Sequence, residues 1–155
     1  MIRRTKTVPE IYFAYASNMD PKTFQRRCPG AKALGRARLP GHRLAFTRYS
    51  RQRRGGSADV VVDAPSEVWG VLYEIDDACL ASMDRVEGVP AAYRRERVTV
   101  FADRGQSLEA ITYVANRMGE FLPSKAYVEV ILRGARAHGL PAGYVQMLER
   151  TGTAL

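Results

Sequence analysis

Hydrophobic and polar residues alternate along the first part of the chain in a way that predicts a strand followed by a helix. Residues 11–15 (IYFAY) form a short apolar and aromatic run, which is typical of a buried strand. Polar Ser17 and Asn18 follow. Asp20 as N-cap and Pro21 at the first helical position then predict a short helix that continues to about Arg27.

The next stretch predicts strands separated by turns. Residues 33–39 and 42–49 are expected to be two strands around a turn at Pro40-Gly41. Residues 58–62 and 67–75 predict two more, separated by a turn at residues 63–66.

The remainder predicts three helices and one hairpin. Asp76 or Asp77 caps a helix over about 78–86 that ends at Gly88, and Ser124 caps another over 125 to about 137. Between them, 93–101 and 107–115 are strands joined by a turn at 103–105, and Pro141 opens a last helix over 141–150. Because strands and helices neither alternate strictly nor segregate, we predict an α+β fold with a mixed, mainly antiparallel sheet curled into a small barrel-like core with flanking helices.

Length and composition favour one globular domain over residues 1–155. Of the 155 residues, 46% are hydrophobic and 26% charged, close to the average for globular proteins. No apolar run approaches the roughly 20 residues of a membrane span. The basic N-terminus has too short and too aromatic an apolar stretch for a signal peptide. The sequence therefore predicts a cytoplasmic protein with no membrane association.

The two cysteines, Cys28 and Cys79, are far apart in the sequence, form no CxxC pair and have no histidine nearby. A zinc site or redox motif is not indicated. We expect two structural thiols in a reducing compartment, with no disulfide framework.

Positive charge is concentrated in the first third of the chain. Residues 1–54 contain 14 basic and 2 acidic side chains, while the whole chain has a net charge of +8. Such asymmetry can mark nucleic-acid binding, but no binding motif accompanies it, so a nucleic-acid partner is not favoured. The tightest cluster, Arg48, Arg51, Arg53 and Arg54, precedes Gly55-Gly56 and is expected to be a solvated, mobile loop.

Several common catalytic and binding motifs are absent from the sequence. There is no P-loop, no dinucleotide-binding GxGxxG, no GxSxG nucleophile elbow and no HExxH zinc motif. The only histidines, His42 and His138, are isolated, and nothing supports a Ser-His-Asp triad.

The turn at Tyr15–Met19 is one candidate site. A sharp turn after a buried strand leaves backbone N–H groups unpaired near a helix N-terminus, and such a nest can hold a carboxylate or an oxyanion. The alternative is an ordinary turn in which Asn18 bonds its own backbone.

Glu87 is a second candidate. Its carboxylate is expected at the end of a helix, where the helix dipole disfavours a negative charge, and a residue that opposes its local electrostatics is often functional. The alternative is a surface glutamate at a frayed helix end.

Five stretches together resemble the gamma-glutamylcyclotransferase family, in the right order and over about residues 11–148. They are Tyr12–Met19 (YFAYASNM), Glu67–Tyr73 (EVWGVLY), Leu80–Val89 followed by Tyr93, Ser107–Tyr113, and the C-terminal segment with Pro123-Ser124, Tyr127, Gly134-Ala135 and His138–Tyr144.

The resemblance implies a mixed α+β domain around a small barrel-like sheet and a specific reaction. In this family the α-amine of a small gamma-glutamyl substrate attacks its own γ-carbonyl, which releases 5-oxoproline and a free amine or amino acid. Because nucleophile and electrophile belong to one molecule, no enzyme nucleophile, metal or cofactor is required.

The resemblance also implies roles for individual residues. Glu87 is the expected catalytic acid and base. Substrate binding is expected from Tyr12, Phe13, Ala14, Tyr15, Ala16, Ser17, Asn18, Tyr93, Tyr113 and Tyr127. For the last three, aromatic packing is an equal alternative to direct contact.

The chain departs from the family at Ala16, where the family usually has glycine. Glycine permits a positive φ and close backbone approach, so alanine is expected to fit if φ is negative here. The substitution and the basic first third leave open a weak or inactive member that binds a small carboxylate ligand or a protein. The leaving group and the oligomeric state are not indicated by the sequence.

Overall fold

The computed structural model describes residues 9–154, so the basic N-terminal segment before Pro9 lies outside the described residues. Within this range, five strands form a closed barrel in the order β1-β3-β2-β4-β5. Four of the strand contacts are antiparallel, while β1 (Glu10–Ala14) meets β5 (Ser107–Ala115) in parallel and closes the barrel. The predicted mixed, mainly antiparallel, barrel-like sheet is confirmed.

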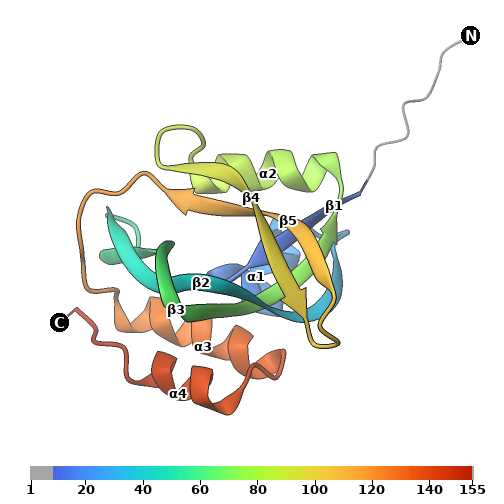
Figure 1. Ribbon diagram of the computed structural model, residues 1–155. Helices are drawn as coiled ribbons and strands as arrows, with labels where there is room; N and C mark the ends of the chain where they lie inside the picture. The colour runs from blue at the N-terminus through green and yellow to red at the C-terminus, as the bar shows by residue number, and fades with distance from the viewer. Residues whose placement is uncertain (1–8, 155) are drawn as a thin grey trace, which may run out of the picture.

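Helices cover the barrel on two sides (Figure 1). α2 (Asp77–Glu87) lies on one side near β4 (Tyr93–Ala102), and α3 (Lys125–Ala137) and α4 (Ala142–Glu149) lie together on the other. The first helical segments are the 3₁₀ turn η1 (Ser17–Met19) and α1 (Pro21–Arg27). No helix in the described range is long and apolar enough to cross a membrane.

β2 (Lys32–Ser50) and β3 (Gly55–Ile75) are longer than the sequence predicts. The turns expected at Pro40-Gly41 and at residues 63–66 are wrong as chain reversals. Pro40 pairs with Glu67 and His42 pairs with Val62, so Gly41 alone lies opposite four residues of β3. The turn residues therefore form a large bulge within two continuous strands, because a bulge bends a strand without ending it.

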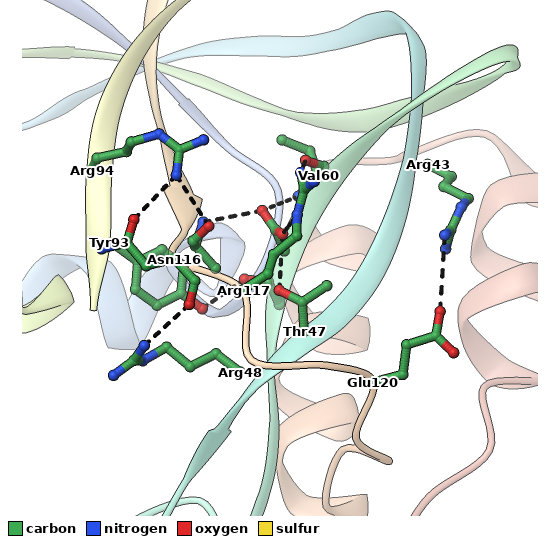
Figure 2. Close-up of polar contacts among 12 residues, drawn as sticks. Arg43, Thr47, Arg48, Val60, Tyr93, Arg94, Asn116, Arg117 and Glu120 are labelled. Carbon is green, nitrogen blue, oxygen red and sulfur yellow. Dashed lines mark hydrogen bonds and ion pairs between the residues drawn. The ribbon is translucent and has the colours of Figure 1, made fainter. Parts of the chain in front are cut away.

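A buried carboxylate connects three strands of the barrel, β2, β3 and β5. Asp59 on β3 is fully buried and accepts hydrogen bonds from Thr47 Oγ1 and Arg117 Nε, both at 2.8 Å; these two residues are labelled in Figure 2. Its other oxygen accepts from the amides of Val60 and Ala115. Since every partner donates to the charged form, the carboxylate is compensated where it is buried.

The expectation that the two cysteines remain separate thiols is wrong. Cys28, directly after α1, forms a disulfide with Cys79 in the first turn of α2, and their Cα atoms are 5.1 Å apart. Sequence spacing could not reveal the pair because 51 residues separate the two positions. The predicted cytoplasmic location stays a prediction.

Candidate active site

One cavity of about 250 Å³ brings together most of the residues predicted from the sequence. Nine of the eleven predicted residues line it, namely Tyr12, Tyr15, Ala16, Ser17, Asn18, Glu87, Tyr93, Tyr113 and Tyr127. They come from β1, η1 and the two residues between them, and from α2, β4, β5 and α3, which follow much later in the sequence. The structure therefore joins the two candidate regions, the turn after β1 and the end of α2, in a single site.

Phe13 and Ala14 do not line the cavity. Both are fully buried in the core on β1. The Phe13 carbonyl accepts a hydrogen bond from Thr112 Oγ1 at 2.8 Å, which attaches β1 to β5. These two residues hold in place the strand that precedes the turn, and their side chains do not line the cavity.

The turn after β1 presents backbone amides to the cavity. The Met19 and Asp20 amides donate back to the carbonyls of Ala16 and Ser17, which closes the 3₁₀ turn. Within residues 9–154, the amides of Ala16, Ser17 and Asn18 have no acceptor. Consecutive unpaired amides of this kind form a concave anion-binding nest.

The Asn18 side chain stabilises the site rather than its own backbone. Its Nδ2 donates to the Tyr12 hydroxyl at 3.0 Å, and its Oδ1 accepts from the Arg27 guanidinium. Arg27 also donates to Ser17 Oγ at 3.4 Å. The alternative of an ordinary turn capped by Asn18 is therefore wrong, and Arg27 is a residue of the site that the sequence analysis did not identify.

Ala16 has φ −131°, so alanine occupies this position without requiring the left-handed region that favours glycine.

Ala16→Gly is expected to retain activity. Ala16→Val should lower kcat/KM by about 10–100-fold, because a β-branched side chain restricts the backbone and projects toward the cavity. Ser17→Ala should cost less, since the amide would still be present. Steady-state kinetics with thermal melts of each variant test this series, and full activity in a folded Ala16→Val protein would contradict it.

α3 supports the turn from behind through Gly134. A Cβ built at Gly134 would lie 2.5 Å from the Asp20 backbone nitrogen and against the Met19 carbonyl carbon. Backbone atoms cannot rotate away, so Gly134→Ala should separate α3 from η1, lower stability by about 1–3 kcal/mol and reduce activity.

Gly143→Ala on α4 is the matched control for this change, since a Cβ there meets nothing within 4 Å. Alanine is the better helix former, so this control should melt at or above the wild-type temperature. Equal melting temperatures for Gly134→Ala and the wild type would show that α3 does not pack so closely on the turn.

Glu87 is the last residue of α2, and the helix end is well defined. Gly88 adopts the left-handed conformation at φ 65°, and the amides of Gly88 and Val89 donate to the carbonyls of Arg85 and Asp84. This hydrogen-bonded end is a glycine C-cap, so the alternative of a frayed helix end is wrong.

The environment of Glu87 makes its carboxyl easier to protonate than that of an exposed glutamate. Burial raises the pKa of the Glu87 carboxyl, and the positive charges of Arg27 and Arg53 partly oppose this. Within the described residues the carboxylate has no hydrogen bond or ion pair. A partly buried, unpartnered carboxyl in a cavity is suited to exchange a proton with a ligand.

The tyrosines divide into two groups by their hydroxyls. Those of Tyr15, Tyr93 and Tyr113 donate to protein acceptors at 2.5–2.7 Å, so these rings form fixed walls. The hydroxyls of Tyr12 and Tyr127 accept hydrogen bonds, and within residues 9–154 their protons have no acceptor. Burial, together with the charge of Glu87, raises the pKa of all five phenols, so each remains protonated at neutral pH.

The basic cluster between β2 and β3 is partly a component of the site. Arg51 and Arg54 are exposed, as expected, but Arg48 and Arg53 line the cavity. The Arg53 guanidinium lies over the Tyr127 ring, 4.1 Å from its centroid. The expectation of a solvated loop is therefore wrong for these two side chains.

The chain is similar to several known proteins. A family model described as "AIG2-like family" matches residues 67–148. Curated proteins named gamma-glutamylcyclotransferase are similar as well. The one from Bos taurus is 33% identical over 89% of this chain and 76% of its own length, and the one from Homo sapiens is 31% identical over 90% and 77%.

The chain belongs to the gamma-glutamylcyclotransferase family. A solved structure entitled "Gamma-glutamyl cyclotransferase" superposes with a TM-score of 0.91 at 29% identity, covering 95% of this chain and 90% of that one. The resemblance inferred from five short stretches is confirmed, and membership of the gamma-glutamylcyclotransferase family supports an enzyme of this kind.

Proposed function

We propose that this protein converts a small gamma-glutamyl compound into 5-oxoproline and a free amine or amino acid. The observation that carries the proposal is the juxtaposition of the unpartnered Glu87 carboxyl and the open amides of Ala16–Asn18 in one cavity. A proton acceptor and a set of oxyanion donors are the two elements that an intramolecular acyl transfer needs.

The proton moves in two steps through one carboxyl group. Glu87 first takes a proton from the α-ammonium of the substrate, and the free amine attacks the γ-carbonyl carbon. The carbonyl electrons move to oxygen and form a tetrahedral oxyanion. When the oxyanion collapses, the bond from carbon to the leaving nitrogen breaks, and the protonated Glu87 gives its proton to that nitrogen. The ring nitrogen still carries a second proton from the attacking amine, and it releases this proton to the Glu87 carboxylate, which passes it to the departing amine or to solvent, so that the neutral lactam remains.

The amides of the turn have one of two tasks in this reaction. They donate either to the oxyanion or to the substrate's α-carboxylate, and Arg27 lies beside them in both cases. Tyr12 and Tyr127 can each donate a hydroxyl proton to the ligand. Tyr15, Tyr93 and Tyr113 shape the cavity around it.

The reaction as proposed needs no metal or cofactor, because the attacking amine is tethered to the carbonyl it attacks. Such tethering alone is worth an effective concentration of about 10⁵ M or more in well-oriented cases. We therefore expect activity in the presence of EDTA. We also propose that residues 1–155 act as one catalytic domain.

The experiment that tests the proposal is incubation of the purified protein with a panel of gamma-glutamyl amino acids and gamma-glutamylamines, followed by mass spectrometry. We expect 5-oxoproline. Free glutamate would contradict the mechanism because hydrolysis requires an activated water. No turnover, together with retained binding of a small carboxylate, would instead support a ligand-binding family member.

A further inference from the structure

The cavity contains more positive than negative charge. Its described lining has one acidic side chain, Glu87, and three basic ones, Arg27, Arg48 and Arg53. None of the three forms an ion pair within residues 9–154. The glutamyl part of a substrate carries one ammonium and one carboxylate. These two charges can pair with Glu87 and with one arginine, and the positive charges of the other two arginines then remain without a counter-charge.

Two of the three arginines already have partners. Arg27 donates to Ser17 and Asn18 beside the amide nest, which places it near the glutamyl end of a ligand. Arg48 donates to the carbonyl of Asn116 at 3.1 Å, and this bond, visible in Figure 2, attaches the end of β2 to the segment after β5.

Arg53 is different because its guanidinium has no hydrogen-bond acceptor among the described residues. Its position is nevertheless defined: its backbone amide donates to Ser50 Oγ at 3.2 Å, and its guanidinium carbon lies over the Tyr127 ring, 4.1 Å from the centroid. A cation–π contact uses none of the guanidinium N–H groups, so these donors are available, and the group can give a carboxylate two parallel hydrogen bonds. The side chain is therefore oriented to receive an anion.

The position of Arg53 along the chain indicates which part of the ligand it would meet. It lies in the turn at residues 51–54, whose neighbours Arg51, Gln52 and Arg54 are exposed, so it borders the open side of the cavity. The nest and Arg27 belong to other segments, β1–η1 and α1. A leaving group must depart toward solvent, and the rim of the cavity is the part of the site through which it can do so.

We propose, on the basis of the function proposed above, that Arg53 binds a carboxylate on the leaving group and so selects gamma-glutamyl compounds whose leaving amine is an amino acid over those whose leaving amine is uncharged. Arg53 is thus a specificity-determining residue that touches the substrate but takes no part in proton transfer. The two classes of substrate have the same reacting atoms. They differ in the carboxylate that only an amino-acid leaving group carries, and Arg53 selects between them by binding that carboxylate.

The test compares two substrates that differ in one charge, gamma-glutamyl-alanine and gamma-glutamyl-alaninamide. A charge-assisted hydrogen bond corresponds to about 10–100-fold in kcat/KM, so the wild type should prefer the carboxylate by that factor. Measured on the pH plateau of each enzyme, because the Arg53 charge also lowers the pKa of Glu87, Arg53→Gln should remove the preference by raising KM for gamma-glutamyl-alanine while leaving the amide within about threefold. Arg53→Lys should restore part of it, because lysine keeps the charge but not the bidentate geometry.

Arg51→Gln is the matched control, since Arg51 is in the same turn, is exposed and does not line the cavity. It should leave both substrates unaffected, and thermal melts should show every variant folded. Equal turnover of both substrates by the wild type, or an equal loss on both in Arg53→Gln, would overturn this inference alone. Failure of the wild type to form 5-oxoproline from either substrate would overturn the proposed function and this inference with it.

Discussion

Glu87→Gln is expected to lower kcat by about 10²–10⁴-fold while KM changes little, because glutamine keeps the size of the side chain but cannot carry the proton. One carboxyl serves both proton transfers in the proposed reaction, so no second group replaces it. Steady-state kinetics on a gamma-glutamyl amino acid measure the effect. Glu96→Gln, at an exposed position of β4, is the control and should behave as the wild type.

The pH profile distinguishes a catalytic loss at Glu87 from a structural one. Burial raises the pKa of Glu87, and the base must be deprotonated, so wild-type activity should fall with decreasing pH through a pKa above that of an ordinary glutamate. The residual activity of Glu87→Gln should lack this acidic limb. Near wild-type turnover in the variant, or an unchanged limb, would remove Glu87 from its assigned role.

Loss of the Cys28–Cys79 disulfide should lower the stability of the folded protein by about 4 kcal/mol, because the bond closes a loop of about 50 residues in the unfolded chain. For a chain of this length the corresponding decrease in melting temperature is roughly 10 °C. Thermal melts of the oxidised protein, with and without reductant, measure it.

The double variant Cys28→Ala/Cys79→Ala provides the control for that measurement. Its melting temperature should equal that of the reduced wild type, and reductant should not lower that temperature further. If the oxidised wild type and the double variant melted at the same temperature, the bond would contribute nothing to stability.

The local elements could be predicted from the sequence because their signals are local. The helix over 125–137 has Ser124 as its N-cap, whose hydroxyl accepts from the Tyr127 amide, and α2 ends at Gly88 as expected. The two long strands were mispredicted because Pro40-Gly41 and residues 63–66 carry turn residues, and only the pairing of one stretch with the other shows that they form a bulge.

The site was predictable where it lies on short, recognisable stretches and not where it depends on packing between distant segments. The turn after β1 and Glu87 could be identified from the YFAYASN run and the glutamate before a glycine. Arg27 and Arg53 could not, because a basic residue in a helix or a charged turn usually faces solvent. Their direction is set by Asn18 and Tyr127, which are 9 and 74 residues away in the sequence.

The proposed specificity residue Arg53 and the proposed proton-transfer residue Glu87 belong to different segments of the chain, the β2–β3 turn and the end of α2. Ser50 pairs with Gly55, so the strand ladder holds both ends of the turn, and Arg54 at φ 57° requires a residue that accepts the left-handed region. Glu87 and the amide nest belong to other segments and would remain in place if these four residues were exchanged. Under the proposed roles, the leaving-group preference could therefore change, in evolution or by design, through a four-residue graft that leaves Glu87 and the amide nest in place, and a graft that keeps a positive charge at position 53 would also preserve its effect on the pKa of Glu87.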